Sequence, residues 1–225
     1  NKAMKDKDIA VIEGVRGLYE GIDSINDIGS TASIAKSLKA PVILIINSRS
    51  LVKSAAALVL GFKALDPEIN IAGVILNKVK NKAHYEKTKK SIEEITNTEV
   101  IGGIIRDDNI SIEQRHLGLV PARERENSLK LIDIWCETIK NSIDLDRLVE
   151  IAKVQSTEAS NAIEGIRTTS TRLKQLLTDK TTPRNRDEEE IAGYRDALNL
   201  IHENYEFIPI TSNYILQLHK TLFSH

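Results

Sequence analysis

The feature that most constrains the fold is an alternation of short Val- and Ile-rich runs with longer amphipathic segments in the first half of the chain. The apolar runs cover residues 9–13, 41–46, 71–76 and 100–105. Short, continuously apolar runs indicate strands that are buried on both faces of a sheet. Because helical segments separate these runs, we predict parallel strands joined by right-handed crossovers.

The intervening segments carry the helical period of 3.6 residues. Helices are predicted over residues 30–38, 50–65 and 82–95. The first of them opens with Ser30 and Thr31, which suit the cap of a helix N-terminus. The first half is therefore predicted to be an α/β domain with helices on both faces of a parallel sheet.

The second half has a different pattern. From about residue 144, helical periodicity continues without a comparable strand-like run. Helices are predicted at residues 145–152, 159–166, 168–177, 187–203 and 211–222. This all-α part has about 70 residues, which is short for a chain that must bury a core by itself.

Composition excludes several classes of protein. The formal net charge is −1, which argues against a nucleic-acid binder that works by bulk charge. The apolar runs, residues 41–46 among them, are far shorter than the roughly 20 residues that span a bilayer. With no signal-peptide core at the N-terminus, we expect a soluble, cytoplasmic protein without a membrane partner.

A single cysteine, Cys136, excludes an intramolecular disulfide and a cysteine-cluster metal site. Its position beside Trp135 in an apolar helical stretch predicts a buried structural thiol.

Residues 9–21, with the sequence IAVIEGVRGLYEG, are the most informative for chemistry. Glu13 closes a predicted strand, and glycines follow at positions 14, 17 and 21. Ligands of open α/β sheets bind beyond the carboxyl ends of the strands, where an acid can hold Mg²⁺ directly or through water. A strand that ends in a turn with a solvated glutamate would explain the same residues.

Four segments of the first half resemble the cobyrinic acid a,c-diamide synthase family, in that family's order. They are EGVRGLYEG, GSTASIAKSLKAPVILII, SAAALVLGFKALDPEINIAGVILNKV and RHLGLVPA. The resemblance assigns residues 1–152 to part of an ATP-binding domain with a dethiobiotin-synthetase-like P-loop NTPase fold. It implies a glutamine-dependent amide ligase that uses ATP and Mg²⁺.

The resemblance also implies roles for single residues. Glu13 matches the acid that ends the Walker-B-like strand and helps bind Mg²⁺, which makes it a catalytic and metal-binding candidate. Tyr19 and Glu20 lie in the loop that faces the tetrapyrrole, Glu20 as a catalytic candidate. Arg16 stands where the family often has Met, and it could meet substrate carboxylates. The family often has Asp at the position of Glu20.

Asn77, in GVILNKV, matches the asparagine that reads adenine in related synthetases. An amide side chain suits that task because it both donates and accepts hydrogen bonds. A turn residue at the end of a strand is the alternative. His116, in the RHLGL segment, could be a general acid–base, although a structural role is the commoner one for such a histidine.

The reaction implied by the resemblance amidates the a and c carboxylates of a tetrapyrrole, as in cobalamin biosynthesis. ATP phosphorylates the carboxylate, and ammonia released from glutamine displaces the phosphate. The substrate is cobyrinate or nickel-sirohydrochlorin, because archaeal relatives that amidate the latter look similar here. The family is compatible with a homodimer.

Two expected parts of such an enzyme are absent from the 225 residues. The chain contains no GxxxxGKS or GxxxxGKT, which the family carries upstream of the strand that ends at Glu13. The glutaminase domain, which follows the ATPase domain in the family, is also absent. We therefore expect residues 1–152 to be part of a ligase that is inactive alone.

Residues 153–225 resemble the N-terminal segment of the Fic family, whose members transfer AMP from ATP to a target hydroxyl. Ser160, Glu164 and Gly165, in SNAIEG, fit that family's inhibitory-helix motif. Ser160 and Glu164 share a helix face, and the glutamate would block productive ATP binding. Without the resemblance, Glu164 is better explained as a solvated helix glutamate near a glycine C-cap. The catalytic motif HPFxxGNGRxxR is absent.

Three interpretations remain. The chain is part of a tetrapyrrole diamide synthase, or a fragment of a Fic-type AMP transferase with an autoinhibitory helix. Alternatively, it is a chimeric or truncated chain without activity of its own, joined near Lys153. A partition-type P-loop ATPase is disfavoured because it explains GVILNKV but not EGVRGLYEG together with RHLGL.

Overall fold

The structure is a computed structural model that describes residues 9–14, 16–107, 110, 114–115, 118–119, 128–163, 170–178, 181–204, 207 and 211–223. The chain forms two compact units. One comprises Ala32–Leu148, and the other comprises Asn1–Thr31 together with Val149–His225. Each unit is described by itself.

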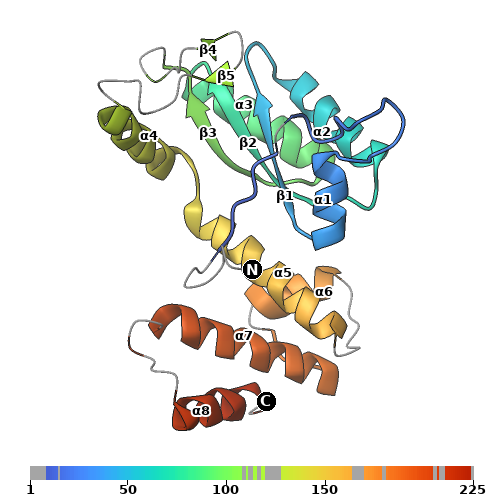
Figure 1. The fold of residues 1–225 in the computed structure, drawn as a ribbon, viewed down its shortest axis with the longest axis vertical. Helices are drawn as coiled ribbons and strands as arrows, with labels where there is room; N and C mark the ends of the chain where they lie inside the picture. Colours follow the sequence, from blue (N-terminus) through green and yellow to red (C-terminus); the bar gives the residue numbers. More distant parts are fainter. Residues whose placement is uncertain are drawn as a thin grey trace. The chain divides into compact units, whose positions relative to one another are not determined.

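A three-stranded sheet organises the unit of residues 32–148 (Figure 1). Its strands are β1 (Val42–Asn47), β2 (Ile71–Val79) and β3 (Val100–Ile105), which lie in the order β1-β2-β3. Both neighbouring pairs are parallel. The predicted parallel α/β arrangement is confirmed for these three strands. A short antiparallel pair, β4 (Gln114–Arg115) with β5 (Gly118–Leu119), follows in the chain.

Helices precede, separate and follow the strands, and α1, α2 and α3 lie where the periodicity predicts them. They are α1 (Thr31–Leu38), α2 (Lys53–Leu65), α3 (Lys82–Thr96) and, after β5, α4 (Ser128–Ser142). Helix α3 begins where the Asn81 side chain accepts a hydrogen bond from the backbone N–H of His84. It ends at Asn97, whose φ of +50° is the left-handed conformation that closes many helices.

Two adjacent glycines on β3 have different neighbours. Successive residues of a strand face opposite sides. Gly102 lies against Ile143, directly after α4, whereas Gly103 lies against the ring of Tyr85 on α3. The core of this unit contains fully buried side chains from α2, β2 and α3, among them Val59, Val74, Leu76, Val79 and Ile92.

The other unit is helical over its described C-terminal residues. Helix α5 (Leu145–Ile163) enters it, and α6 (Ser170–Thr178), α7 (Arg186–Asn204) and α8 (Ser212–Leu222) follow. The two helices predicted at 145–152 and 159–166 are one continuous helix as far as Ile163. This α5 runs through the predicted domain boundary at residue 152, and the predicted domain division itself stays a prediction.

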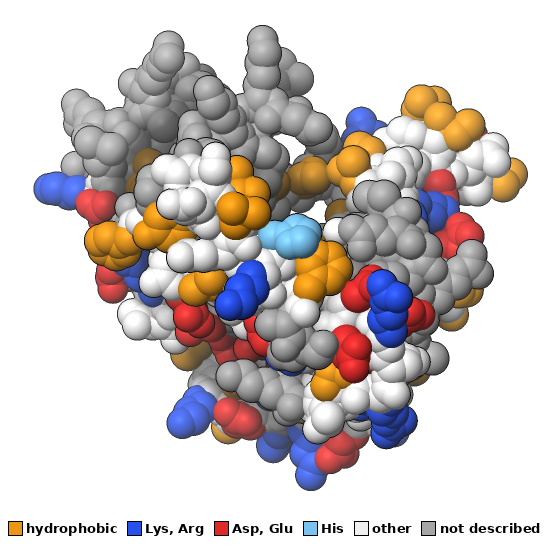
Figure 2. Space-filling view, turned by 90° about the horizontal axis from the view of Figure 1, so that it is seen from below, with side chains coloured by type: hydrophobic (Ala, Val, Ile, Leu, Met, Phe, Trp, Pro, Cys, Tyr) orange, Lys and Arg blue, Asp and Glu red, His pale blue; other side chains and the backbone are white. Residues whose placement is uncertain are grey.

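A small apolar core joins these helices, formed by Leu173, Leu176 and Ile191 with Val154 and Leu177 packed against them. Helix α8 crosses α7 so closely that a Cβ at Gly193 would collide with the carbonyl oxygen of Leu222. On the face of the molecule in Figure 2, basic and acidic side chains are interspersed with hydrophobic ones. This mixture agrees with a net charge near zero.

An ion pair between Arg172 and Glu188 links α6 to the start of α7. Arg172 donates to Glu188 through Nε (2.9 Å) and a terminal nitrogen (2.7 Å), and both side chains are largely buried. The Arg172 guanidinium holds the pKa of Glu188 at about 2, below its ordinary 4.5. The backbone N–H of Arg184 donates to the same carboxylate. These hydrogen bonds connect α6, α7 and the polar segment between them.

The predicted first strand is wrong for this structure. Residues 9–14 form no helix or strand, and Val11 and Ile12 are 91% and 58% exposed. Continuous apolarity indicates a tendency to be buried, but a strand also needs a neighbouring backbone with which to exchange hydrogen bonds. The described backbone provides residues 9–14 with no such partner.

The predicted burial of Cys136 is also wrong, because its side chain is exposed. The inner face of α4 carries the half-buried Leu131, Trp135 and Thr138, at helical spacing. Cys136 follows Trp135 directly and is therefore rotated by about 100° away from that face. Within the described part of the chain, no helix is both long enough and apolar enough to cross a membrane.

Candidate functional site

The carboxyl ends of β1 and β2 bring together polar residues that are 30 positions apart in the chain. Asn47 and Asn77 are direct partners across the two parallel strands. Ser48, which follows β1 and is completely buried, donates to the carbonyl oxygen of Asn77 through its backbone N–H and its Oγ, each at 2.8 Å. The main chain at Asn77 is therefore held from the side of β1.

A bulge in β2 sets the direction of the Asn77 side chain. Leu76 pairs with Gly103 and Val79 with Ile105, so that two residues of β2 oppose one of β3. Within this bulge Lys78 has a φ of +57°, and its N–H donates to Asn77 Oδ1 at 2.8 Å. Bulges next to functional sites commonly redirect a side chain in this way.

The half-buried Asn77 carboxamide keeps part of its hydrogen-bonding capacity. Its oxygen accepts one bond, from Lys78, and can accept another. Its Nδ2 donates no hydrogen bond to any described residue. One donor group and one acceptor on the same planar amide can bind a base edge that presents an acceptor beside a donor.

His84, on the first turn of α3, joins the two loops. Its Nδ1 accepts from the backbone N–H of Lys80 at 3.1 Å, and its Nε2 lies 2.6 Å from the carbonyl oxygen of Leu51. Since the Lys80 N–H can only donate, Nδ1 is the acceptor and Nε2 carries the proton. The neutral Nε2–H tautomer therefore links the loop after β1 to the loop after β2.

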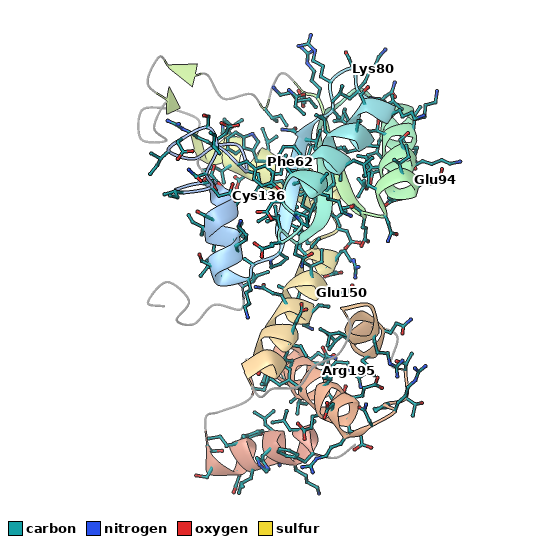
Figure 3. All side chains as sticks on the ribbon, turned by 90° about the vertical axis from the view of Figure 1, so that its right-hand side faces the viewer. Phe62, Lys80, Glu94, Cys136, Glu150 and Arg195 are labelled. Carbon is teal, nitrogen blue, oxygen red and sulfur yellow. The ribbon has the colours of Figure 1, made fainter. Side chains whose placement is uncertain are left out.

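Exposed cations follow the same strand ends. Arg49 lies after β1, Lys78 within the β2 bulge and Lys80 after it. Figure 3 shows Lys80 at this end of the unit, away from the core. Such a group attracts anions such as the phosphates of a nucleotide.

The other predicted residues lie in the unit that contains Asn1–Thr31. Glu13, Arg16 and Glu20 are exposed, and Tyr19 is half-buried. A turn closed by the N–H of Glu20 and the carbonyl oxygen of Gly17 (3.2 Å) presents this segment. The structure describes these residues and Asn77 in separate units, so their joint use in one site stays a prediction.

The described side chains include no cluster of three or more His, Cys, Asp or Glu residues that could hold a metal ion. An exposed carboxylate such as Glu13 is nevertheless a suitable single ligand for Mg²⁺. That ion commonly binds one or two carboxylates and fills its other positions with water and phosphate oxygens.

The predicted regulatory motif is only partly visible. Ser160 is half-buried on α5, whereas Glu164 and Gly165 lie outside the described residues. The side chain of His116 is also outside them. The inhibitory-helix motif and the Fic resemblance of residues 153–225 therefore stay predictions.

Sequence reasoning missed Ser48 and His84. Ser48 directly follows an apolar run, and His84 stands three residues after the Asn81 cap. Both positions are compatible with ordinary turn and helix residues. Only the pairing of the strands shows that these two residues contact the loops around Asn77.

The first part of the chain is similar to known proteins. Residues 1–114 match the family described as AAA domain. Three archaeal proteins named cobyrinate a,c-diamide synthase are similar to the N-terminal two-thirds of the chain. The relative from Methanobrevibacter smithii is 88% identical over 152 residues, which cover 68% of this chain and 34% of the relative.

The relative from Methanosphaera stadtmanae is 65% identical, and that from Methanothermobacter thermautotrophicus is 61% identical. Each alignment covers 64% of this chain and 32% of the relative. The chain thus spans about a third of the length of these relatives. Since the family match covers half of the chain and includes all three strands of the parallel sheet, this protein belongs to the AAA domain family.

Proposed function

We propose that this chain supplies the nucleotide-binding part of an amide ligase that uses ATP and glutamine to amidate the a and c carboxylates of a tetrapyrrole. The observation that carries the proposal is the 88% identity over 152 residues to the Methanobrevibacter smithii protein named cobyrinate a,c-diamide synthase. The AAA domain match and the polar strand ends support nucleotide binding.

In this proposal Asn77 binds the adenine base. Its amide offers a donor and an acceptor, and the Ser48 bonds hold its backbone in place. The exposed Arg49, Lys78 and Lys80 provide positive charge beside the phosphates.

Glu13 is the proposed ligand for Mg²⁺, which would supply neutralisation of charge during phosphoryl transfer. Arg16 and Tyr19 bind the substrate: the Arg16 cation pairs with peripheral carboxylates, and Tyr19 contacts the macrocycle. Glu20, in the same loop as Tyr19, is the proposed second catalytic residue. Cobyrinate is the substrate in the names of the relatives, and nickel-sirohydrochlorin is the alternative.

The partner that supplies ammonia is a glutaminase domain, as the resemblance implies. Without it, and without a P-loop motif in the 225 residues, we propose that the chain forms no amide by itself. A homodimer is the proposed assembly.

A segment exchange tests this function. Residues 1–152 replace the matching segment of the Methanobrevibacter smithii relative, and mass spectrometry follows ATP- and glutamine-dependent diamide formation. We expect an active ligase, in which Glu13→Ala lowers the rate about 10- to 100-fold, as loss of a metal-site contact does. The control is Glu94→Ala, because Glu94 projects from α3 and forms an exposed i,i+4 ion pair with Lys90. An inactive exchange protein would refute the proposed ligase, and an active Glu13→Ala variant would refute the role of Glu13.

A further inference from the structure

The loops after β1 and β2 are held together by hydrogen bonds that converge on Asn77 and its neighbours. From the β1 side, Ser48 donates twice to the Asn77 carbonyl oxygen, at 2.8 Å from both N and Oγ. Ser48 has no exposed surface, so no water competes for these bonds. A buried hydroxyl that donates to a backbone carbonyl in this way fixes the position of the residue that carries the carbonyl.

From the α3 side, His84 holds the residues that follow Asn77. The ring accepts from the Lys80 N–H at Nδ1 and donates to Leu51 O from Nε2, at 3.1 and 2.6 Å. The Thr88 hydroxyl lies 3.2 Å from the same Leu51 oxygen and 2.8 Å from the His84 carbonyl oxygen. With one proton, this hydroxyl supports the link but cannot replace the histidine.

The Ser48 and His84 contacts flank a residue, Lys78, whose backbone conformation is unfavourable by itself. Lys78 occupies the left-handed region with a φ of +57°, a conformation that costs a non-glycine residue energy. It persists because residues 77 and 80 are held on either side. The direction of the Asn77 carboxamide depends on this conformation, since Oδ1 accepts the Lys78 N–H.

We infer that Ser48 and His84 are positioning residues for base recognition by Asn77. Neither side chain touches the base. Ser48 fixes the backbone at Asn77, and His84 fixes the backbone at Lys80, so that together they hold the carboxamide in one orientation before a nucleotide arrives. This inference rests on the proposed role of Asn77 and adds to it the residues that determine selectivity for adenine over guanine.

The test measures selectivity between bases, which a merely structural role would leave unchanged. The segment-exchange protein, in which residues 1–152 replace the matching segment of the Methanobrevibacter smithii relative, is titrated with ATP and with GTP, and ligand-observed NMR gives the two dissociation constants. We expect Ser48→Ala and His84→Ala to lower the preference for ATP over GTP by about 3- to 10-fold, the effect of losing one hydrogen bond. His84→Gln, whose amide can reproduce the Nε2 donor, restores part of the preference.

A matched control is Ser37→Ala. The Ser37 hydroxyl also donates to a backbone oxygen at 2.8 Å, but it does so on α1, to Ser33. A second readout needs no nucleotide: the Asn77 side-chain amide signals of the free chain should show greater mobility in Ser48→Ala and His84→Ala, and not in Ser37→Ala.

Base reading by Asn77 and positioning by Ser48 and His84 fail under different outcomes. Equal binding of ATP and GTP by the unsubstituted exchange protein would refute base reading by Asn77, and absent binding of both nucleotides would refute the proposed nucleotide-binding role. If the exchange protein prefers ATP and Asn77→Ala abolishes that preference while Ser48→Ala and His84→Ala preserve it, the positioning role is refuted. Unchanged mobility of the Asn77 amide in both variants would refute it as well.

Discussion

Gly102 on β3 gives the sharpest test of how the sheet packs. A Cβ at this position would collide with the backbone carbonyl oxygen of Ser142 and lie 2.8 Å from the Cα of Ile143. Both atoms belong to the main chain, which cannot swing aside as a flexible side chain can. The backbone would have to separate where Asp144 N–H donates to Ile101 O at 2.9 Å.

The expected cost of Gly102→Ala follows from these contacts. Overpacking a well-packed site costs about 1–3 kcal/mol. Loss of the Asp144 hydrogen bond adds about 0.5–1.5 kcal/mol. We therefore expect the free energy of unfolding to fall by about 1.5–4.5 kcal/mol.

Gly61→Ala is the matched control. Gly61 lies inside the exposed part of α2, and a Cβ there would meet no atom within 4 Å. The same chemical change should raise stability by about 1 kcal/mol, because alanine favours the helix over glycine by that amount.

Urea unfolding measures both changes, with the fluorescence of Trp135 as the probe. Trp135 is the only tryptophan and lies in the same unit, where its Nε1–H donates to Ile110 O at 3.0 Å. The comparison is made at unchanged m-value. If Gly102→Ala stays within about 0.5 kcal/mol of the unsubstituted chain, the size of an ordinary surface substitution, the described approach of α4 to β3 is wrong.

Three further predictions concern other parts of the molecule. Thr96→Val should leave stability unchanged or raise it by about 1 kcal/mol in urea unfolding, because the buried Thr96 Oγ1 has no hydrogen-bond partner among the described residues; a clear loss would contradict this. The Arg172 contact, which lowers the pKa of Glu188 to about 2, should stabilise the helical unit above pH 4.5, and this stabilisation should be lost as the pH falls from 4.5 towards 2. Circular dichroism at several pH values measures it, and Glu188→Gln should show a weaker pH dependence. If residues 153–225 are extended with a Fic catalytic segment, Glu164→Gly should increase AMP transfer from labelled ATP; no increase would remove the inhibitory assignment.

Much of the α/β unit could be predicted from the sequence because its signals are local. The runs at residues 41–46, 71–76 and 100–105 all became strands within a few residues of the predicted bounds. Helices α1, α2 and α3 likewise follow the periodicity that separates those runs. Burial on both faces and a 3.6-residue period are properties of short segments, so no knowledge of the partners was needed.

The wrong predictions concern residues whose environment depends on distant parts of the chain. Residues 9–14 are as apolar as the observed strands, but the described backbone offers them no hydrogen-bond partner. Cys136 lies in an apolar stretch, but one residue of rotation decides between the inner face with Trp135 and solvent. In both cases the outcome depends on which element lies opposite, and composition carries no information about that.

In the candidate site, too, some features follow from local sequence and others only from tertiary contacts. The sequence by itself predicted that Asn77 directly follows an apolar strand run, and it showed that Glu13, Arg16, Tyr19 and Glu20 share one glycine-rich segment. Only the tertiary structure decided that Ser48 holds the backbone at Asn77 and that His84 holds the backbone at Lys80. Those contacts arise because β1 and β2 pair in parallel with Asn47 beside Asn77, which brings the ends of two distant segments to one edge of the sheet. Hydrogen bonds of about 3 Å depend on that register, and a register is a property of two strands together.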